Sequence, residues 1–254
     1  MPYYYLYDSY LAAPRWGQQL IKLEATLTDL GIQGRVGRLT LLKSVKDLVE
    51  AAIRDGADTV VAVGNDLTLS RVADVVAKQP NVTVGFIPLG GEQQEMARLL
   101  GIPHGLLACH VLSSRLTEVV SLGKINNQHF LRSVTAEGQP TLVCENEHGQ
   151  YELQLTSPHD IKVCNLDRWG SADGEIADPS NNVLEAVLRP HSSRRWWQRA
   201  DEAWASLIPI QSLKLSSTDD LPITVDGHRV VKAPATITLA RERLKLIVGK
   251  KRLV

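Results

Sequence analysis

The feature that most constrains the fold of this chain is a short run of residues from Thr59 to Val63, TVVAV. Every position in the run is β-branched or apolar, so a strand formed here would have no polar face. Strands of this kind lie inside parallel sheets that are covered on both faces. Because parallel strands need crossover connections, which are usually α-helices, the run predicts a βαβ architecture.

The segments around this run alternate between helix and strand patterns. Ser44 is a predicted N-cap with Asp47 three residues later, which is the pattern of a capping box. Gly31, Gly56 and Gly101 mark predicted helix ends. The predicted elements are a strand at 3–7, helices at 20–30 and 45–53, a strand at 59–63, a helix at about 68–77, a strand at 82–90 and a helix at 92–101. Together they predict an α/β domain with a parallel sheet.

The pattern changes after Gly123, where short alternating segments are separated by Gly, Asn, Asp and Pro. This pattern is typical of antiparallel sheet, and one helix is predicted within it, at 193–207. A chain of 254 residues is long enough for two domains. We expect an α/β nucleotide-binding-like domain at 1–122 and a β-sandwich-like substrate domain at 123–254, with the C-terminal tail packing back on the first domain.

The composition narrows the class of protein. Lys plus Arg and Asp plus Glu both number 28, so no overall positive charge exists to bind nucleic acid, and we expect no nucleic-acid partner. The three cysteines are odd in number and form no CxxC pair, which fits a reducing cytoplasm. The start of the chain lacks a basic leader, and no run approaches the ~18 apolar residues of a membrane span. We expect a cytoplasmic protein, with peripheral contact at the inner membrane face as an option.

Two predicted strand-to-helix turns lie where open α/β sheets bind their ligands, outside the carboxyl ends of the strands. In the first turn, Gly64 to Thr68, Asp66 could hold Mg²⁺ and the Thr68 hydroxyl could donate to a phosphate. The alternative is that Asp66 or Thr68 simply caps a helix. The second turn, Pro88 to Gly91, permits either a close backbone approach or a tight bend. Spacing alone leaves these alternatives open.

The order of these motifs resembles the diacylglycerol kinase catalytic-domain family, which includes bacterial lipid kinases and sphingosine kinases and is related in fold to the NAD kinases. The family motif GGDGT is similar to residues 64–68, GNDLT, and the later motif PLGTGNDFARxLGIP to residues 88–103, PLGGEQQEMARLLGIP. Residues 120–133, VSLGKINNQHFLRS, resemble the next family segment. The turn at 226–228, DGH, resembles the family's DGE turn near the C-terminus.

The resemblance implies ATP and Mg²⁺ as cofactors and a cleft between the two domains. The residues that it places at the nucleotide are Gly64, Asn65, Asp66, Thr68, Gly90, Gly91 and Glu95. Asp66 would also hold the metal and act in catalysis. Asp226 and Gly227 would contact the substrate, and His228 stands where the family has the acid that takes the proton from a lipid hydroxyl. A histidine can serve as a general base near neutral pH.

The departures from the family motifs are as informative as the matches. Asn65 and Leu67 replace two glycines of GGDGT, and a left-handed non-glycine residue costs roughly 1–2 kcal/mol. On the family's phosphate path, Leu67 should therefore be an obstruction. Residues 93–95, QQE, replace Gly-Asn-Asp with one extra residue in the turn, and the first strand is followed by Asp8 instead of an Asn-Pro phosphate turn.

Three functions stay open on this basis. The first is an ATP-dependent lipid kinase, with reduced activity, that phosphorylates a hydroxyl of a diacylglycerol-like or sphingoid lipid. The second is a pseudokinase of the same fold that binds a nucleotide, a lipid or a protein without transfer. The third is a small-molecule kinase of the NAD kinase type.

Three further groups of residues allow more than one interpretation. Arg194, Arg195, Trp196 and Trp197 suit a peripheral membrane contact, whereas packing against the β domain or a homodimer contact would explain the same residues. His104, Cys109 and His110 lack the spacing of a zinc site, and we read Cys109 as a small buried residue. The acidic run 167–175 reads as a solvated loop, with substrate contact as the minor alternative.

Overall fold

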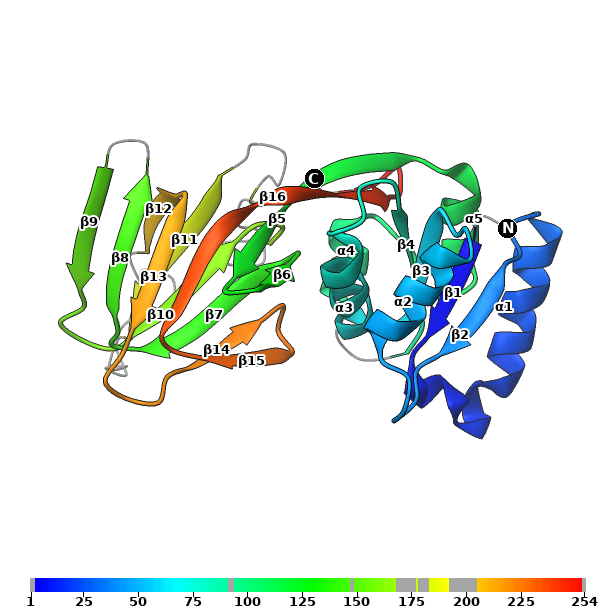
Figure 1. Cartoon of the computed structure of the whole chain (residues 1–254), viewed down its shortest axis with the longest axis horizontal. Helices are drawn as coiled ribbons and strands as arrows, with labels where there is room; N and C mark the ends of the chain where they lie inside the picture. The colour runs from blue at the N-terminus through cyan, green and yellow to red at the C-terminus, as the bar shows by residue number, and fades with distance from the viewer. Residues whose placement is uncertain are drawn as a thin grey trace, which may run out of the picture. The chain divides into compact units, whose positions relative to one another are not determined.

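The structure is a computed structural model that describes residues 3–90, 94–146, 149–167, 177, 183–191 and 205–252. The chain forms two compact units (Figure 1). Unit 1 contains Met1–Val120 and Glu242–Val254, and unit 2 contains Ser121–Arg241. No helix in the described part of the chain is long and apolar enough to cross a membrane.

Unit 1 is built on a parallel sheet with the strand order β2-β1-β3-β4-β16. The strands are β1 (Tyr3–Tyr7), β2 (Arg35–Arg38), β3 (Thr59–Gly64), β4 (Thr83–Pro88) and the last residues of β16 (Ala235–Ile247). The helices are α1 (Gly17–Asp29), α2 (Val45–Arg54), α3 (Asp66–Val76), α4 (Glu95–Leu99) and α5 (Leu107–Ser114). α2 packs with α3 and against β1, whereas α5 packs with α1 and against β4.

Local chemistry explains most of these elements. Every residue of β3 is buried, as its apolar pattern predicts. Ser44 and Asp47 form the predicted capping box at the start of α2. α3 begins at Asp66, two residues earlier than predicted, because Asn65 caps it. The sequence did not predict two elements, the strand β2 and the helix α5. In β2 only Gly37 is buried, so the strand has no apolar pattern. The helix α5 follows directly on a glycine-containing turn.

The carboxyl ends of the parallel strands share one edge of the sheet, and hydrogen bonds link the chain where it leaves them. The amide of Asp8, after β1, donates to the carbonyl of Val63 in β3 at 3.0 Å. The amide of Leu89, after β4, donates to the carbonyl of Gly64 at 2.8 Å. The amide of Leu39, after β2, donates to the carbonyl of Tyr7 at 2.9 Å. The segments that follow these four strands are therefore neighbours.

Unit 2 contains two antiparallel sheets whose buried side chains form one core. One sheet has the order β12-β11-β10-β7-β14-β15, and the other has β16-β13-β8-β9 with β5 beside β16 and β6 beside β5. The strands not yet given are β5 (Thr117–Ile125), β6 (Gln128–Phe130), β7 (Ser133–Gly138), β8 (Thr141–Asn146), β9 (Gly149–Gln154), β10 (His159–Cys164), β11 (Leu184–Pro190), β12 (Ser206–Ile210), β13 (Ser212–Ser216), β14 (Pro222–Val225) and β15 (Arg229–Lys232).

The predicted fold class, an α/β domain with a parallel sheet followed by a β-sandwich-like domain, is confirmed. The helix predicted at 193–207 lies mostly outside the described residues, as do Arg194, Arg195, Trp196 and Trp197. At its end the prediction is wrong, because Ser206 and Leu207 belong to β12, where Leu207 pairs with Val187 of β11.

Candidate functional site

The turn after β3 is organised by a capping box. The amide of Thr68 donates to Oδ1 of Asn65 at 3.1 Å, and the amide of Asn65 donates to Oγ1 of Thr68 at 3.3 Å. Asn65 has an extended backbone with φ −105°, and Leu67 lies in the first turn of α3. The expectation of left-handed strain at Leu67 is therefore wrong, because the residues between Gly64 and Thr68 start a helix instead of wrapping around an anion.

The Thr68 hydroxyl also connects this turn to the end of β1. It donates to Oδ2 of Asp8 at 2.6 Å, and both residues are buried. Oδ1 of Asp8 accepts from the amide of Tyr10 at 3.4 Å and from the hydroxyl of Ser9 at 3.2 Å. A Cβ on Gly64 would lie 2.4 Å from Oγ1 of Thr68 and 3.1 Å from Cβ of Asp8. Gly64 is thus required for this contact, and the chain's own polar groups cover its backbone.

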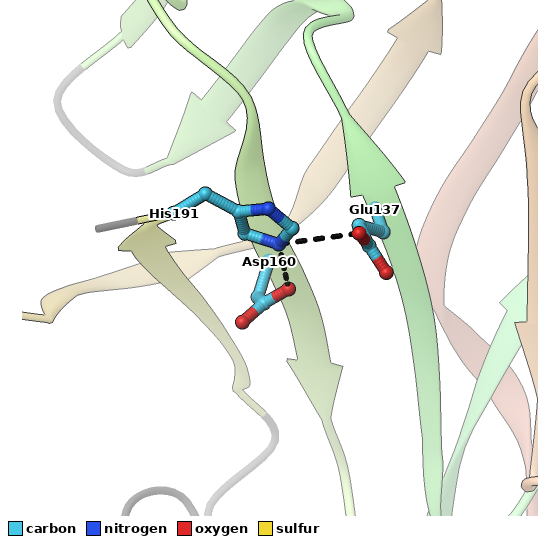
Figure 2. A group of neighbouring side chains, drawn as sticks. All are labelled: Glu137, Asp160 and His191. Carbon is cyan, nitrogen blue, oxygen red and sulfur yellow. Dashed lines mark hydrogen bonds and ion pairs between the residues drawn. The ribbon is translucent and has the colours of Figure 1, made fainter. Parts of the chain in front are cut away.

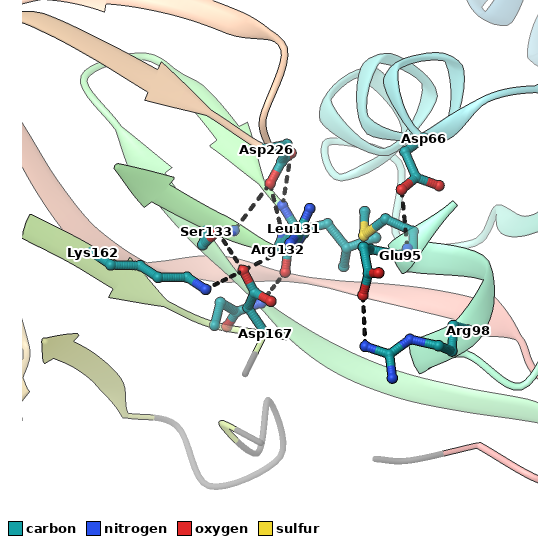
Figure 3. Close-up of polar contacts among 11 residues, drawn as sticks. Asp66, Glu95, Arg98, Leu131, Arg132, Ser133, Lys162, Asp167 and Asp226 are labelled. Atoms are coloured by element: carbon teal, nitrogen blue, oxygen red, sulfur yellow. Dashed lines mark hydrogen bonds and ion pairs between the residues drawn. The ribbon is translucent and has the colours of Figure 1, made fainter. Parts of the chain in front are cut away.

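Asp66 joins α3 to α4. Its side chain is 2% exposed, and Oδ2 accepts a hydrogen bond from the amide of Met96 at 3.1 Å (Figure 3). Met96 is the second residue of α4, so Asp66 places a negative charge at a helix N-terminus, where it is stabilised. The Glu95 side chain, also predicted to face the nucleotide, is partly exposed and pairs with Arg98 at 2.6 Å (Figure 3).

The turn after β4 is covered by aromatic rings. Gly90 has φ +77°, and a Cβ there would lie 2.7 Å from the Trp16 ring and 3.2 Å from the Tyr10 ring. The Tyr10 hydroxyl donates to the carbonyl of Leu89 at 2.5 Å, and its ring meets the Trp16 ring edge-on. Within the described part of the chain, the buried Nε1 of Trp16 has no hydrogen-bond partner. Gly91, the other predicted glycine, lies outside the described residues.

These contacts determine how well the carboxyl edge of the sheet could hold ATP and Mg²⁺, the cofactors that the sequence resemblance implies. Asp8 and Asp66 provide carboxylate oxygens and Thr68 a hydroxyl, which are the hard oxygen donors that Mg²⁺ takes. The backbones of Gly64 and Gly90 are not open to a phosphate in this conformation. The atoms over Gly90 belong to the far end of the Trp16 side chain, which can change rotamer without moving the backbone. The edge therefore offers the oxygen donors that Mg²⁺ takes, whereas a phosphate could approach the backbone of Gly90 only after the Trp16 ring is displaced.

In unit 2, Asp226 is a structural anchor. It lies in the tight turn between β14 and β15, where Asp226 and Gly227 have φ of 51° and 77°. Its buried carboxylate accepts hydrogen bonds from three consecutive amides (Figure 3). It also pairs with the guanidinium of Arg229. The donors are the amides of Leu131 at 3.2 Å, Arg132 at 2.8 Å and Ser133 at 3.2 Å, and Nη2 of Arg229 at 3.2 Å.

The anchored turn fixes the backbone that carries His228. The amide of His228 donates to the carbonyl of Val225 at 3.1 Å, which closes the turn, and the imidazole is partly exposed. Gly227 is exposed at the tip of the turn. Asp226, Gly227 and His228 thus lie on one turn whose backbone is held in place, and His228 is partly exposed.

Asp167 is a second anchored carboxylate, which the sequence did not reveal. It is 3% exposed, and its Oδ2 lies 2.9 Å from Nζ of Lys162, 3.0 Å from Nε of Arg132 and 2.7 Å from the hydroxyl of Ser133 (Figure 3). Burial alone would raise its pKa, but the two cations and the hydrogen bonds lower the pKa overall. For Asp167 the prediction of a solvated loop is wrong, and residues 168–175 of that run lie outside the described residues.

The remaining predicted clusters are simpler. Cys109 is fully buried, as predicted, and burial raises the pKa of its thiol to about 11. Nε2 of His104 accepts a long hydrogen bond of 3.4 Å from the amide of Gly90. A different histidine, His191, lies on the surface of unit 2, 2.6 Å from Asp160 and 3.4 Å from Glu137 (Figure 2). The hydrogen bond to Asp160 raises the pKa of His191 above its usual value.

We predict that Asp226→Ala lowers the free energy of unfolding by about 3–5 kcal/mol, because three backbone amides and one guanidinium lose their acceptor. Urea denaturation measures this change. The control is Asp220→Ala, which removes an exposed ion pair with Lys232 and should cost less than ~1 kcal/mol. Equal costs for the two variants would contradict the anchoring role of Asp226.

We predict a raised pKa for His191 in the folded protein. The ion pair then stabilises the fold fully below the unfolded-state pKa of histidine, and this stabilisation disappears as pH rises through the folded pKa. Titration of the imidazole by NMR checks the direction. Asp160→Asn should lower the pKa of His191 toward its usual value, and an unchanged pKa would disprove the assigned cause.

Comparisons with known proteins agree with these features. The family model of the diacylglycerol kinase catalytic domain matches residues 12–125. A diacylglycerol kinase of Staphylococcus haemolyticus is 35% identical over 96 residues, and one of Staphylococcus aureus is 34% identical over 96 residues. These matches cover 37% of this chain but only 28% and 30% of the two relatives.

The solved structures extend the likeness of fold to nearly the whole chain. A diacylglycerol kinase structure from Bacillus anthracis matches with a TM-score of 0.74 and 15% identity, covering 98% of this chain and 97% of that chain. An NAD kinase from Archaeoglobus fulgidus, solved in complex with ATP, matches with a TM-score of 0.59 and 13% identity, covering 99% and 95%. The chain has the fold that these two groups of kinases share, and its residues 12–125 match the family model of the diacylglycerol kinase catalytic domain.

Proposed function

We propose that this protein is a lipid kinase of the diacylglycerol kinase type, which transfers a phosphoryl group from ATP to a hydroxyl of a diacylglycerol-like or sphingoid lipid. The observation that carries the proposal is the position of two family motifs. The two motifs, residues 64–68 and 88–90, begin at the last residues of the neighbouring strands β3 and β4 and are linked by the hydrogen bond from the amide of Leu89 to the carbonyl of Gly64. Ligands of open α/β sheets bind at this edge.

Each residue to which we assign a role has the chemistry for that role. ATP with Mg²⁺ would supply the phosphoryl group and the cation that offsets its charge. Asp66 and Asp8 would hold the cation, and Thr68 keeps Asp8 oriented by its hydrogen bond. His228, partly exposed on the turn that Asp226 anchors, would accept the proton from the lipid hydroxyl. Trp16 must leave Gly90 before a phosphate can approach the backbone, so we expect slow transfer.

A second candidate is a pseudokinase of the same fold, and a specific observation favours it. The residues that would serve phosphate and metal already have partners within the chain: Thr68 bonds Asp8, and Asp66 bonds the amide of Met96. Binding a nucleotide must therefore compete with interactions that stabilise the fold. The small-molecule kinase alternative is supported by the fold likeness to NAD kinases.

We predict that the purified chain, given γ-labelled ATP, Mg²⁺ and a mixed lipid extract, labels a lipid. His228→Ala should reduce the rate at least tenfold without changing nucleotide affinity, because a general base contributes to transfer and not to binding. His191→Ala is the matched control and should keep the wild-type rate. Nucleotide binding without labelled lipid would select the pseudokinase, and absence of both nucleotide binding and transfer would contradict the kinase and leave only a pseudokinase that binds a lipid or a protein.

We predict that Trp16→Ala strengthens nucleotide binding several-fold, because the variant no longer has to displace a ring from Gly90. A thermal-shift titration with Mg-ATP measures the affinity, since a ligand that binds the native state raises the melting temperature. Leu67→Gly is the comparison: it should give no gain, because Leu67 is already helical. Unchanged affinity in Trp16→Ala would show that the ring does not control access.

A further inference from the structure

Two adjacent leucines are fully exposed in unit 1. Leu41 and Leu42 have relative exposures of 106% and 93%, higher than any other large hydrophobic side chain in the described part of the chain. The next most exposed are Ile21 at 70% and Val230 at 65%. Single exposed apolar residues are ordinary on protein surfaces, but an adjacent pair at full exposure calls for an explanation.

Hydrogen bonds hold this pair at the tip of a tight turn. The amides of Thr40 and Lys43 each donate to the other's carbonyl at 3.4 Å. Oγ1 of Thr40 accepts from the amide of Leu42 at 3.3 Å and from the amide of Lys43 at 3.2 Å. On one side Leu39 bonds the end of β1, and on the other Ser44 caps α2. The turn is therefore fixed to the sheet and to a helix, and the leucines point outward without a conformational change.

The charged side chains in the segment that contains Leu41 and Leu42 are all positive. Residues 35–46, RVGRLTLLKSVK, contain four basic side chains and no acidic one. The basic residues are Arg35, Arg38, Lys43 and Lys46, all exposed.

The acidic groups that contact this segment leave its tip positive. Asp47 accepts hydrogen bonds from Ser44 in the capping box, and Asp55 pairs with Arg35. Glu50 lies 3.9 Å from Lys46 along the surface of α2. Lys43, next to the leucines, has no ion pair with any residue that the structure describes.

The turn also lies at the edge of the candidate site. It follows β2, which is parallel to β1, and the sheet order places β2 beside the strand that ends at Asp8. The amide of Leu39 bonds the carbonyl of Tyr7, directly before Asp8. A surface that binds this tip would thus be next to the carboxyl edge at which the strand ends of unit 1 meet.

We propose that the turn from Thr40 to Lys43 docks the protein on an anionic phospholipid bilayer, with Leu41 and Leu42 inserted at headgroup depth and Lys43 and Lys46 facing lipid phosphates. Apolar side chains flanked by cations are the chemistry of interfacial membrane binding. A convex tip of two side chains is too small for a stable protein interface, which needs about 800 Å² on each partner. The proposed function gives this docking a purpose, because it would bring the enzyme to its lipid substrate. The docking itself does not depend on that function, because the protein can bind a bilayer without phosphoryl transfer.

The test is co-sedimentation of the full chain with vesicles, without nucleotide. Phosphatidylcholine vesicles containing phosphatidylglycerol should bind the protein, and binding should weaken as salt rises. Leu41→Ser/Leu42→Ser should weaken binding at least tenfold. Lys43→Gln should weaken binding to anionic vesicles about fivefold, which corresponds to the loss of about one cation–surface contact. Val230→Ser, which changes an exposed apolar residue of β15, is the matched control and should bind like the wild type.

Several outcomes would overturn the docking. Wild-type affinity in the double serine variant, or no binding of the wild type to anionic vesicles, would exclude it. A wild-type dimer that becomes monomeric in the double serine variant would assign the leucines to a second copy of this chain instead. Transfer to lipid in detergent micelles reports on the proposed function separately: activity there without vesicle binding refutes only the docking, whereas binding without activity refutes only the transfer.

Discussion

The hydrogen bond from Thr68 to Asp8 is the interaction on which the site in unit 1 depends. It joins the residues that follow β1 and β3 directly above Gly64, where a Cβ would lie 2.4 Å from the hydroxyl. Both partners are buried, so removal of either would leave a polar group without compensation, which costs about 1–3 kcal/mol or more for a charge. The same hydroxyl accepts from the amide of Asn65, so this contact also sets the first residue of α3. The polar groups of residues 64–68, GNDLT, thus stabilise the fold, and a ligand would have to compete for them.

The parts of the fold that local chemistry determines were predictable from sequence. Tyr3–Tyr7 and Thr59–Val63 are apolar runs that could only be buried strands, and Ser44 with Asp47 specified the start of α2. β2 was not predictable, because its sequence RVGR buries only Gly37, beneath the Tyr4 side chain. The polar centre at Asp167 was not predictable for a different reason. Its partners lie on two segments that are distant in sequence, Arg132 and Ser133 at the start of β7 and Lys162 in β10, and the pairing of β7 with β10 brings them together.

The candidate site shows where motif comparison stops being informative. Comparison with GGDGT identified Asp66 and Thr68 as polar residues at the right strand end, and both are there. It interpreted Asn65 and Leu67 as damaged glycines, whereas the structure shows an N-cap and a helical residue. The motif could not reveal Trp16, since its contact with Gly90 joins two segments that are separated by most of unit 1. In the DGH turn, the Asp226 carboxylate accepts three backbone hydrogen bonds that hold the fold. An aspartate at this position is therefore explained by its structural role and does not by itself indicate catalysis.

Charge at the carboxyl edge explains how this chain differs from a simple anion site. The start of a helix attracts an anion with roughly half a positive charge, and such contacts contribute about 0.3–1 kcal/mol at a surface. Here Asp66 is the first residue of α3, and its carboxylate accepts a hydrogen bond from an amide at the start of α4. Asp8 adds a second carboxylate, which is bonded to the Thr68 hydroxyl. A triphosphate would meet two negative charges beside one helix start, and the helix alone cannot offset their repulsion. Under the proposed function, a divalent cation held by Asp8 and Asp66 would reverse that balance, so the metal would supply much of the attraction for the nucleotide as well as its chemistry.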